Sequence, residues 1–473
     1  MLSISTIFFQ FCPYFRRYPQ PNFGIFNLYQ QHPMSDLSYI SLRGNRAYNT
    51  VVRPDFELYF EASKNIYHPV DNPHGTFPLN VADNNLNWSI LSKKLQHISA
   101  TQKIPHWVSG YTSGRGHETF RAALAEFVGN FLANRPLDPE NIGVAAGATA
   151  VIELSAIILA DKGDVAVFPA PAYPVYSRDI MNKAGVERYD LITHHDSDAI
   201  HHGPILSIEH LEKAKQDIEY QGSNFKLLVV TNPDNPTGGL YTAEQLETIA
   251  DWCIERKIHF IVNEIYGLVT INTKHPSIVT DYAHQHQFTS FLSIIHQKNS
   301  PYLHQWYALS KDIGISGMRV GTVYSLNQPF LSAFNNLSLP HMVSNHTQWL
   351  LENVLGDQKF MRNFLDAQQQ ALTKGYIVVV EMLKKLNIPF VPSYGSLFVW
   401  ADFSKFLKTE TLTGEMEFWE NLYKNTGVLL TPGIGFGHTK KGMFRIVYTC
   451  FDDGSLLVAM ARIADYLSSL SKS

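Results

Sequence analysis

Short apolar runs alternate with apolar segments of helical period through the middle of the chain, from residue 119 to residue 324. Strands that alternate with helices usually pair in parallel, and the helices then cover the two faces of the sheet. The runs that predict strands are 165–168, 227–230, 259–262 and 320–324. The pattern therefore predicts an α/β fold with a mainly parallel central sheet covered by helices.

A second region follows this sheet. A long helical stretch, about 331–386, leads to two further predicted strands at 397–400 and 444–448. With 473 residues, 45% of them hydrophobic, the chain is long enough for two domains. We expect a large domain at 76–334 and a smaller, discontinuous α+β domain formed by 35–75 and 335–473.

The first 33 residues contain no Asp or Glu, and Arg16 and Arg17 follow an apolar stretch at 4–11 that is too short to span a bilayer. Three interpretations stay open for residues 1–34. They are a transit segment, because such segments are poor in acids and contain arginine, a disordered arm, or an extension upstream of a true start at Met34.

Composition argues against several classes of partner. The 38 Lys and Arg residues against 42 Asp and Glu give a net charge of −4 without a long basic run, so nucleic acid is not an expected partner. No later stretch reaches 18 apolar residues, which argues against a membrane span.

Three widely spaced cysteines predict a reducing, cytoplasmic location. The pairs at 194–195 and 201–202 are the most conspicuous of the 20 histidines but lack metal-ligand spacing, so no metal is expected.

The segment 310–321 carries a lysine, Lys311, and an arginine eight residues later, Arg319. A lysine that is partly desolvated and near another cation loses pKa and can form a Schiff base with an aldehyde. Arg319 is suited to bind a phosphate with its planar set of donors. This pairing of functions matches the aldehyde and phosphate of pyridoxal phosphate.

Three upstream segments fit the same ligand. Gly147, Ala148 and Thr149 form a small-residue turn before an apolar helical stretch, where backbone N–H groups can face a phosphate. Asn235 follows the predicted strand at 227–230, and Tyr266 follows the one at 259–262. Ligands of open α/β sheets bind beyond the carboxyl ends of the strands, so both side chains can reach the phenolic oxygen of the cofactor ring.

With these segments in order, residues 40–465 resemble the class I and II aminotransferases, which are fold type I pyridoxal-phosphate enzymes. The stretches 82–86, 147–150 and 171–179 are most similar to the branch of the 1-aminocyclopropane-1-carboxylate synthases. The resemblance implies bound pyridoxal 5′-phosphate, amino acid and 2-oxo acid substrates, and a homodimer with shared active sites.

The resemblance also implies roles for individual residues. Lys311 corresponds to the catalytic lysine that binds the cofactor and moves the proton between Cα and the cofactor. The remaining correspondences are Tyr173 for stacking on the pyridine ring, Asn235 and Tyr266 for its phenolic oxygen, Gly147, Ala148, Thr149, Ser310 and Arg319 for the phosphate, Tyr111 for the phosphate of the neighbouring subunit, and Arg445 for the substrate α-carboxylate.

Asn263 and Asp83 depart from the family pattern. Asn263 stands where the family has an aspartate that pairs with the protonated ring nitrogen, and an amide cannot supply that charge. Glu264 is adjacent, but on a strand its side chain is expected to point to the opposite face. Asp83 replaces a glutamate that the synthases use in substrate recognition, which argues against S-adenosylmethionine as substrate.

The sequence therefore predicts a pyridoxal-phosphate-dependent aminotransferase acting on an α-amino acid. One alternative is a lyase or cyclase of the cyclopropane-synthase type. Another is a degenerate member that binds the cofactor and has a regulatory role.

Overall fold

The computed structural model describes residues 39–48, 53–193 and 205–470. The chain divides into two compact units, 1–52 and 53–473. The first unit contains helix α1 (Leu42–Tyr48). The second unit, which begins at Arg53, contains the sheets and the candidate site. The predicted extension at 1–34 and the histidine pairs near residue 200 lie outside the described residues.

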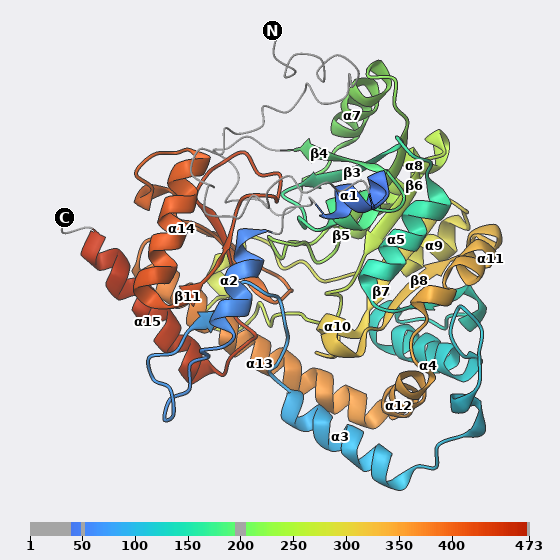
Figure 1. The fold of residues 1–473 in the computed structure, drawn as a ribbon, viewed down its shortest axis with the longest axis horizontal. Helices are drawn as coiled ribbons and strands as arrows, with labels where there is room; N and C mark the ends of the chain where they lie inside the picture. Colours follow the sequence, from blue (N-terminus) through green and yellow to red (C-terminus); the bar gives the residue numbers. More distant parts are fainter. Residues whose placement is uncertain (1–38, 49–52, 194–204, 471–473) are drawn as a thin grey trace. The chain divides into compact units, whose positions relative to one another are not determined.

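A seven-stranded sheet forms the centre of this second unit (Figure 1). The order of its strands is β2 (Ile142–Ala145), β8 (Gly321–Ser325), β7 (Leu303–Ala308), β6 (His259–Asn263), β5 (Phe225–Thr231), β3 (Val165–Ala170) and β4 (Glu187–Ile192). Strand β8 runs antiparallel to both of its neighbours, β2 and β7, and the other pairs in this sheet are parallel. The predicted, mainly parallel sheet is confirmed.

Helices cover both faces of the sheet because successive strand side chains point to opposite sides. Leu227 and Val229 pack in a core with α5, α6 and α11, whereas Leu228 and Val230 pack in a second core. The first group comprises α5 (Ala148–Leu159), α6 (Tyr176–Met181) and α11 (Gln328–Leu337). The second core includes residues of α3 (Trp88–Thr101), α4 (Glu118–Val128), α7 (Ile208–Tyr220), α8 (Ala243–Arg256), α9 (Leu292–Lys298) and α12 (Asn345–Leu355).

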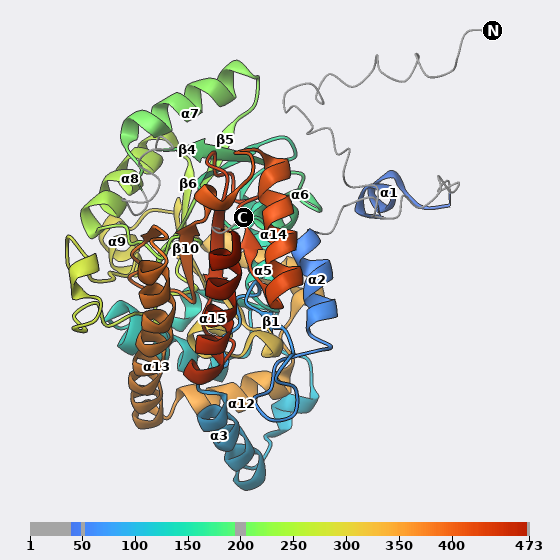
Figure 2. The same ribbon diagram turned by 90° about the vertical axis from the view of Figure 1, so that its left-hand side faces the viewer.

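A smaller antiparallel sheet has the order β12 (Thr431–Pro432), β13 (Met443–Val447), β10 (Phe398–Asp402) and β9 (Phe390–Val391). Nearby, β1 (Phe77–Pro78) pairs in parallel with β11 (Val428–Leu429), which joins an early segment to the C-terminal part of the chain. The associated helices are α2 (Pro54–Ala62), α13 (Gln358–Lys385), α14 (Leu412–Thr426) and α15 (Asp453–Leu470). Figure 2 shows α13, α14 and α15 close together.

The expected helical stretch at 331–386 consists of α11, α12 and α13. Strands β2, β4 and β7 were not predicted from the sequence. Strand β7 lacks an apolar pattern because it buries polar side chains that find partners inside the protein. His304 contacts Ser325, and Gln305 donates a hydrogen bond to Glu264.

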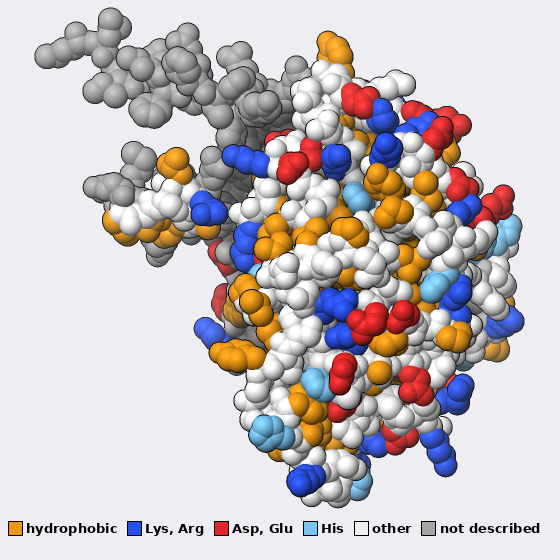
Figure 3. Space-filling view, turned by 90° about the vertical axis from the view of Figure 1, so that its right-hand side faces the viewer, with side chains coloured by type: hydrophobic (Ala, Val, Ile, Leu, Met, Phe, Trp, Pro, Cys, Tyr) orange, Lys and Arg blue, Asp and Glu red, His pale blue; other side chains and the backbone are white. Residues whose placement is uncertain are grey.

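None of the described helices combines the length and the apolar character that a membrane span requires. On the face drawn in Figure 3, basic side chains are interspersed with acidic ones.

A chain of hydrogen bonds links two histidines inside the large sheet. His259 Nδ1 lies 3.0 Å from His304 Nε2, and His304 Nδ1 lies 2.9 Å from Ser325 Oγ. Burial lowers the pKa of His259 to about 4, and it lowers the pKa of His304 well below its usual range. Both rings are therefore neutral in the folded protein at pH 7.

This network predicts acid sensitivity. Because the folded pKa of His259 lies below its unfolded value, the unfolded chain takes up more protons between about pH 6.5 and 4, and stability falls as the pH falls. Between pH 7 and 4.5 the wild type should lose about 2.5 kcal/mol more unfolding free energy than His259→Gln. Urea unfolding at the two pH values measures this difference, and parallel losses in both proteins would contradict it.

Candidate active site

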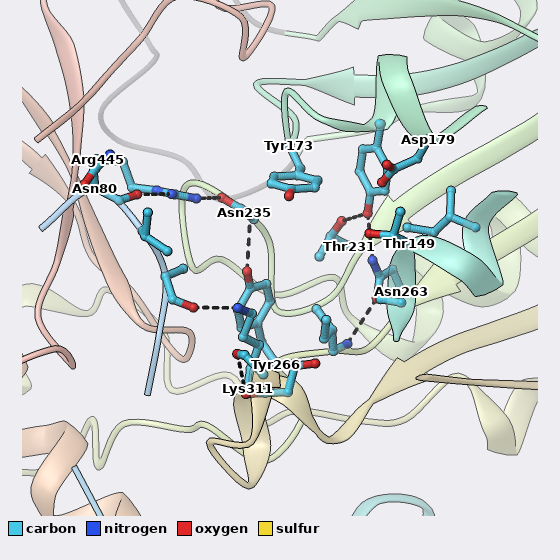
Figure 4. A pocket seen from close by; sticks show the side chains of 18 of the residues that line it. Asn80, Thr149, Tyr173, Asp179, Thr231, Asn235, Asn263, Tyr266, Lys311 and Arg445 are labelled. Atoms are coloured by element: carbon cyan, nitrogen blue, oxygen red, sulfur yellow. Dashed lines mark hydrogen bonds between the residues drawn. The ribbon is translucent and has the colours of Figure 1, made fainter. Parts of the chain in front are cut away.

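One pocket collects most of the residues that the sequence singles out (Figure 4). It lies beyond the carboxyl ends of β5 and β6, at the N-terminus of α5, and it is closed by β13 and by residues 80–82. The predicted residues that line it are Ala148, Thr149, Tyr173, Asn235, Asn263, Tyr266, Ser310, Lys311, Arg319 and Arg445. Segments that are remote in the sequence thus meet at one edge of the sheet.

Lys311 projects into the pocket from the short helix α10 (Leu309–Asp312), which follows β7. Its Nζ donates a hydrogen bond to the Ala82 carbonyl at 2.6 Å, and its own carbonyl accepts one from Asn84 Nδ2 at 2.8 Å. Burial lowers the pKa of Lys311, although the nearby Asp83 carboxylate opposes this effect. A lysine with a lowered pKa in a pocket is suited to act as a nucleophile and as a base.

The N-terminus of α5 faces the side chain of Arg319. Gly147 caps this helix with φ of +90°, a backbone conformation that favours glycine. A Cβ at residue 147 would lie 2.7 Å from Arg319 Cζ, so the guanidinium occupies the space left by the missing side chain. Arg319 is itself oriented by a hydrogen bond from Nη1 to the Ser316 carbonyl at 3.0 Å. Backbone donors and a guanidinium facing one space suit an anion.

Asn235, Tyr266 and Arg445 form a connected, buried group. Arg445 Nη1 donates to Asn235 Oδ1 at 2.9 Å, and Asn235 Nδ2 donates to the Tyr266 hydroxyl at 3.4 Å. Arg445 Nη2 donates to the Asn80 carbonyl at 2.9 Å, and the guanidinium lies 4.7 Å from the centre of the Phe398 ring. The Nε atom of Arg445 is buried without a partner, so the arginine retains a donor for an incoming anion.

The ring of Tyr173 borders the pocket and meets Tyr176 edge to face at 5.4 Å (Figure 4). Burial raises the pKa of Tyr173 to about 12, so its hydroxyl stays protonated. Asn263 ends β6 and donates from Nδ2 to the Tyr176 hydroxyl at 2.8 Å. That hydroxyl also lies 3.0 Å from Thr231 Oγ1.

Glu264 points away from the pocket, as the alternation of strand side chains predicts. Its carboxylate accepts hydrogen bonds from Ser290 Oγ, the Phe291 backbone N–H and Gln305 Nε2. Glu264 therefore does not replace the aspartate that the family pattern has at residue 263.

Three of the predicted site residues do not line the pocket. Gly147 lies against the guanidinium of Arg319, which itself lines the pocket. Asp83 lies close enough to raise the pKa of Lys311, but its side chain is not part of the wall. Tyr111 is fully exposed and lines a separate surface depression with Trp107 and His117, so within this chain it is not part of the site.

The structure adds residues that were not predicted from the sequence. They are Arg53, Phe56, Asn80, Val81, Ala82, Ile152, Tyr176, Asp179, Thr231, Ile265 and Ser316. Tyr176 and Asp179 belong to the stretch 171–179. Their spacing could have predicted their place in the site, because residues three positions apart lie on the same face of a helix. Arg53 and Phe56 had none, because a long stretch of chain separates them from the other site residues.

The pocket contains unsatisfied polar atoms that point to a ligand. Asn80 Oδ1, Asp179 Oδ2 and Arg445 Nε are buried without a hydrogen-bond partner. Burying a polar atom in this way costs free energy unless a ligand or water satisfies it. Together with Lys311, whose pKa is lowered, and the N-terminus of α5 beside Arg319, these atoms are compatible with a polar, phosphorylated aldehyde cofactor and an amino acid. No group of metal-ligating side chains occurs among the described residues.

Comparisons with known proteins agree with this arrangement. The family model described as aminotransferase class I and II matches residues 80–463. A 1-aminocyclopropane-1-carboxylate synthase from Glycine max is 30% identical over 428 residues, covering 88% of this chain and 85% of the relative. 1-Aminocyclopropane-1-carboxylate synthase 9 from Arabidopsis thaliana is also 30% identical, and the match covers 86% of each chain.

Solved structures share the fold at lower identity. An archaeal alanine:glyoxylate aminotransferase superposes with a TM-score of 0.74 at 16% identity, covering 92% of this chain and all of the other. A double mutant of the Thermus thermophilus aspartate aminotransferase gives 0.71 at 19% identity, covering 89% and 98%. These neighbours confirm the predicted fold type I. The chain belongs to the class I and II aminotransferase family, whose members depend on pyridoxal 5′-phosphate, and is similar to its 1-aminocyclopropane-1-carboxylate synthase branch.

Proposed function

We propose that the protein is an aminotransferase that acts on an α-amino acid. The observation that carries the proposal is the placement of Lys311 and Arg445 in the walls of one pocket. An amino acid presents an amine and a carboxylate on the same carbon. A buried arginine with an unpartnered donor matches the carboxylate, and a lysine with a lowered pKa can act as the base at the carbon that carries the amine.

Each residue then has a chemical task. The α5 N-terminus, Ser310 and Arg319 hold the phosphate, while Tyr173 covers the ring. Asn235 and Tyr266 bind the phenolic oxygen, and Arg445 orients the substrate carboxylate. Lys311 would act as the base and acid that moves the proton at Cα of the substrate. When bound, pyridoxal phosphate supplies an electron sink for the carbanion at Cα.

The proposal extends to assembly. Tyr111 is fully exposed, which suits a residue that contacts the phosphate of a neighbouring subunit in a homodimer. We also propose the domain division at 76–334, with 35–75 and 335–473 forming the smaller domain, and a cytoplasmic location.

A lyase or cyclase reaction is the second candidate. It is favoured by the similarity to the 1-aminocyclopropane-1-carboxylate synthases of Glycine max and Arabidopsis thaliana. It is opposed by Asp83, which is one methylene shorter than the glutamate of those synthases. A regulatory protein that retains the cofactor is the third candidate.

Absorption spectra distinguish these candidates. The protein is loaded with pyridoxal phosphate and titrated with a panel of amino acids and with S-adenosylmethionine. For a transaminase, a donor should remove the band of the lysine-bound cofactor and produce the band of its amine form, with one 2-oxo acid released per site. Lys311→Ala is the control and should show neither change.

The other outcomes are equally informative. Consumption of S-adenosylmethionine without the amine form would replace the transaminase proposal by the lyase. A band that no amino acid alters, with no consumption of S-adenosylmethionine, would contradict both enzyme proposals and leave the regulatory one.

Gly147→Ala tests the phosphate site. The added Cβ displaces the Arg319 guanidinium, so the dissociation constant for pyridoxal phosphate should rise at least about tenfold, a loss of about 1.4 kcal/mol. Titration of cofactor absorbance measures it.

Gly163→Ala is a matched control for this substitution. Gly163 has a φ of +91°, but a Cβ added there would have no heavy atom within 4 Å, so the variant reproduces the backbone strain without the clash. Equal weakening of cofactor binding by both variants would show that Arg319 does not hold the phosphate.

A further inference from the structure

The amide of Asn263 is held in one orientation by its neighbours. Its Oδ1 accepts a hydrogen bond from the Ile265 backbone N–H at 3.2 Å, and its Nδ2 donates to the Tyr176 hydroxyl at 2.8 Å. A backbone N–H can only donate, so rotating the amide would place two donors against each other. The oxygen therefore faces Ile265, and the nitrogen faces Tyr176.

This orientation leaves one donor for a ligand. An amide nitrogen carries two hydrogens, and Tyr176 accepts only one of them. Among the described residues, no other side chain accepts the second. Asn263 is 4% exposed and lines the pocket, so this N–H can be satisfied only by a molecule bound there.

The ring nitrogen is the part of the cofactor that meets Asn263. It lies across the pyridine ring from the carbon that bears the aldehyde, and the aldehyde carbon must face Lys311. In Figure 4, Lys311 and Asn263 lie on different sides of the space next to the Tyr173 ring. This inference rests on the proposed function, because it takes that placement of the ring from it.

A pyridine nitrogen accepts a hydrogen bond when it is unprotonated and donates one when it is protonated. Facing an N–H donor, only the unprotonated form makes a favourable contact. We propose that Asn263 holds the ring nitrogen of bound pyridoxal phosphate in its unprotonated form, with Tyr176 and Ile265 as the positioning residues that fix the amide.

Two buried acids lie near enough to the site to be compared with the missing aspartate. Glu264 is bound to Ser290, Phe291 and Gln305 on the other face of β6. Asp179 lines the pocket with Oδ2 unpartnered, but burial raises its pKa to about 7. Within the described part of the chain, neither acid is hydrogen-bonded to Asn263 or Tyr176, so neither is placed to charge the ring nitrogen through them.

The proposal has a consequence for the chemistry. An unprotonated ring withdraws electrons from Cα less strongly than a protonated one, so the site stabilises a carbanion less well. Asn263→Asp should restore the charge without disturbing the local fold. The carboxylate can still accept from Ile265, and the Tyr176 hydroxyl can rotate to donate instead of accept.

The direct test is the nitrogen NMR shift of pyridoxal phosphate labelled with ¹⁵N in its ring and bound to the full-length protein. The wild type should show the shift of a neutral pyridine, and Asn263→Asp should show that of a pyridinium. Asn232→Asp is the matched control, because Asn232 is a buried asparagine next to the end of β5 that does not line the pocket. It should keep the neutral shift.

A pyridinium shift in the wild type would overturn the inference. If Asp179→Asn then returned the shift to the neutral value, Asp179 would be identified as the source of the charge. Turnover provides a second readout, and Asn263→Asp should raise it at least about tenfold. A protein that does not bind the cofactor at all would instead contradict the proposed function, so the two failures are distinguishable.

Discussion

The site depends on the hydrogen bonds made by the buried guanidinium of Arg445. Arg445 lies on β13 of the small sheet, yet its hydrogen bonds go to Asn235, beyond the end of β5 in the large sheet, and to the Asn80 carbonyl. A buried charge is costly unless hydrogen bonds satisfy it, so these partners must stay in place. The Arg445 side chain thereby connects three segments that are remote in the sequence, and residues of all three line the pocket.

Much of the fold and site could be predicted because the relevant signals are local. Buried parallel strands are continuous apolar runs, and Asn235, Asn263 and Tyr266 follow such runs directly. Strand β7 was missed for the converse reason, since His304 and Gln305 make it look polar until their partners are known. Arg53 could not be found at all, because no local pattern links it to residues such as Tyr173.

The sequence shows only that Asn263 stands where the family has an aspartate, so that a negative charge is missing at this position. In the structure it is an amide with a fixed orientation, because Ile265 and Tyr176 occupy one acceptor and one donor position. The Glu264 side chain points away from the pocket, as strand alternation predicts. Because its carboxylate is hydrogen-bonded to Ser290 and Gln305, Glu264 does not take the place of the family's aspartate. The neighbouring residues therefore fix the orientation of the Asn263 amide.

The central claim is that Lys311 is the residue that bonds to the cofactor. Borohydride reduction of the pyridoxal-phosphate-loaded protein, followed by peptide mapping by mass spectrometry, tests it directly, because reduction makes the link between cofactor and amine permanent. The account predicts a single pyridoxyl group on the peptide that contains Lys311, and none in Lys311→Ala. A pyridoxyl group on a different lysine, or its persistence in that variant, would contradict the account.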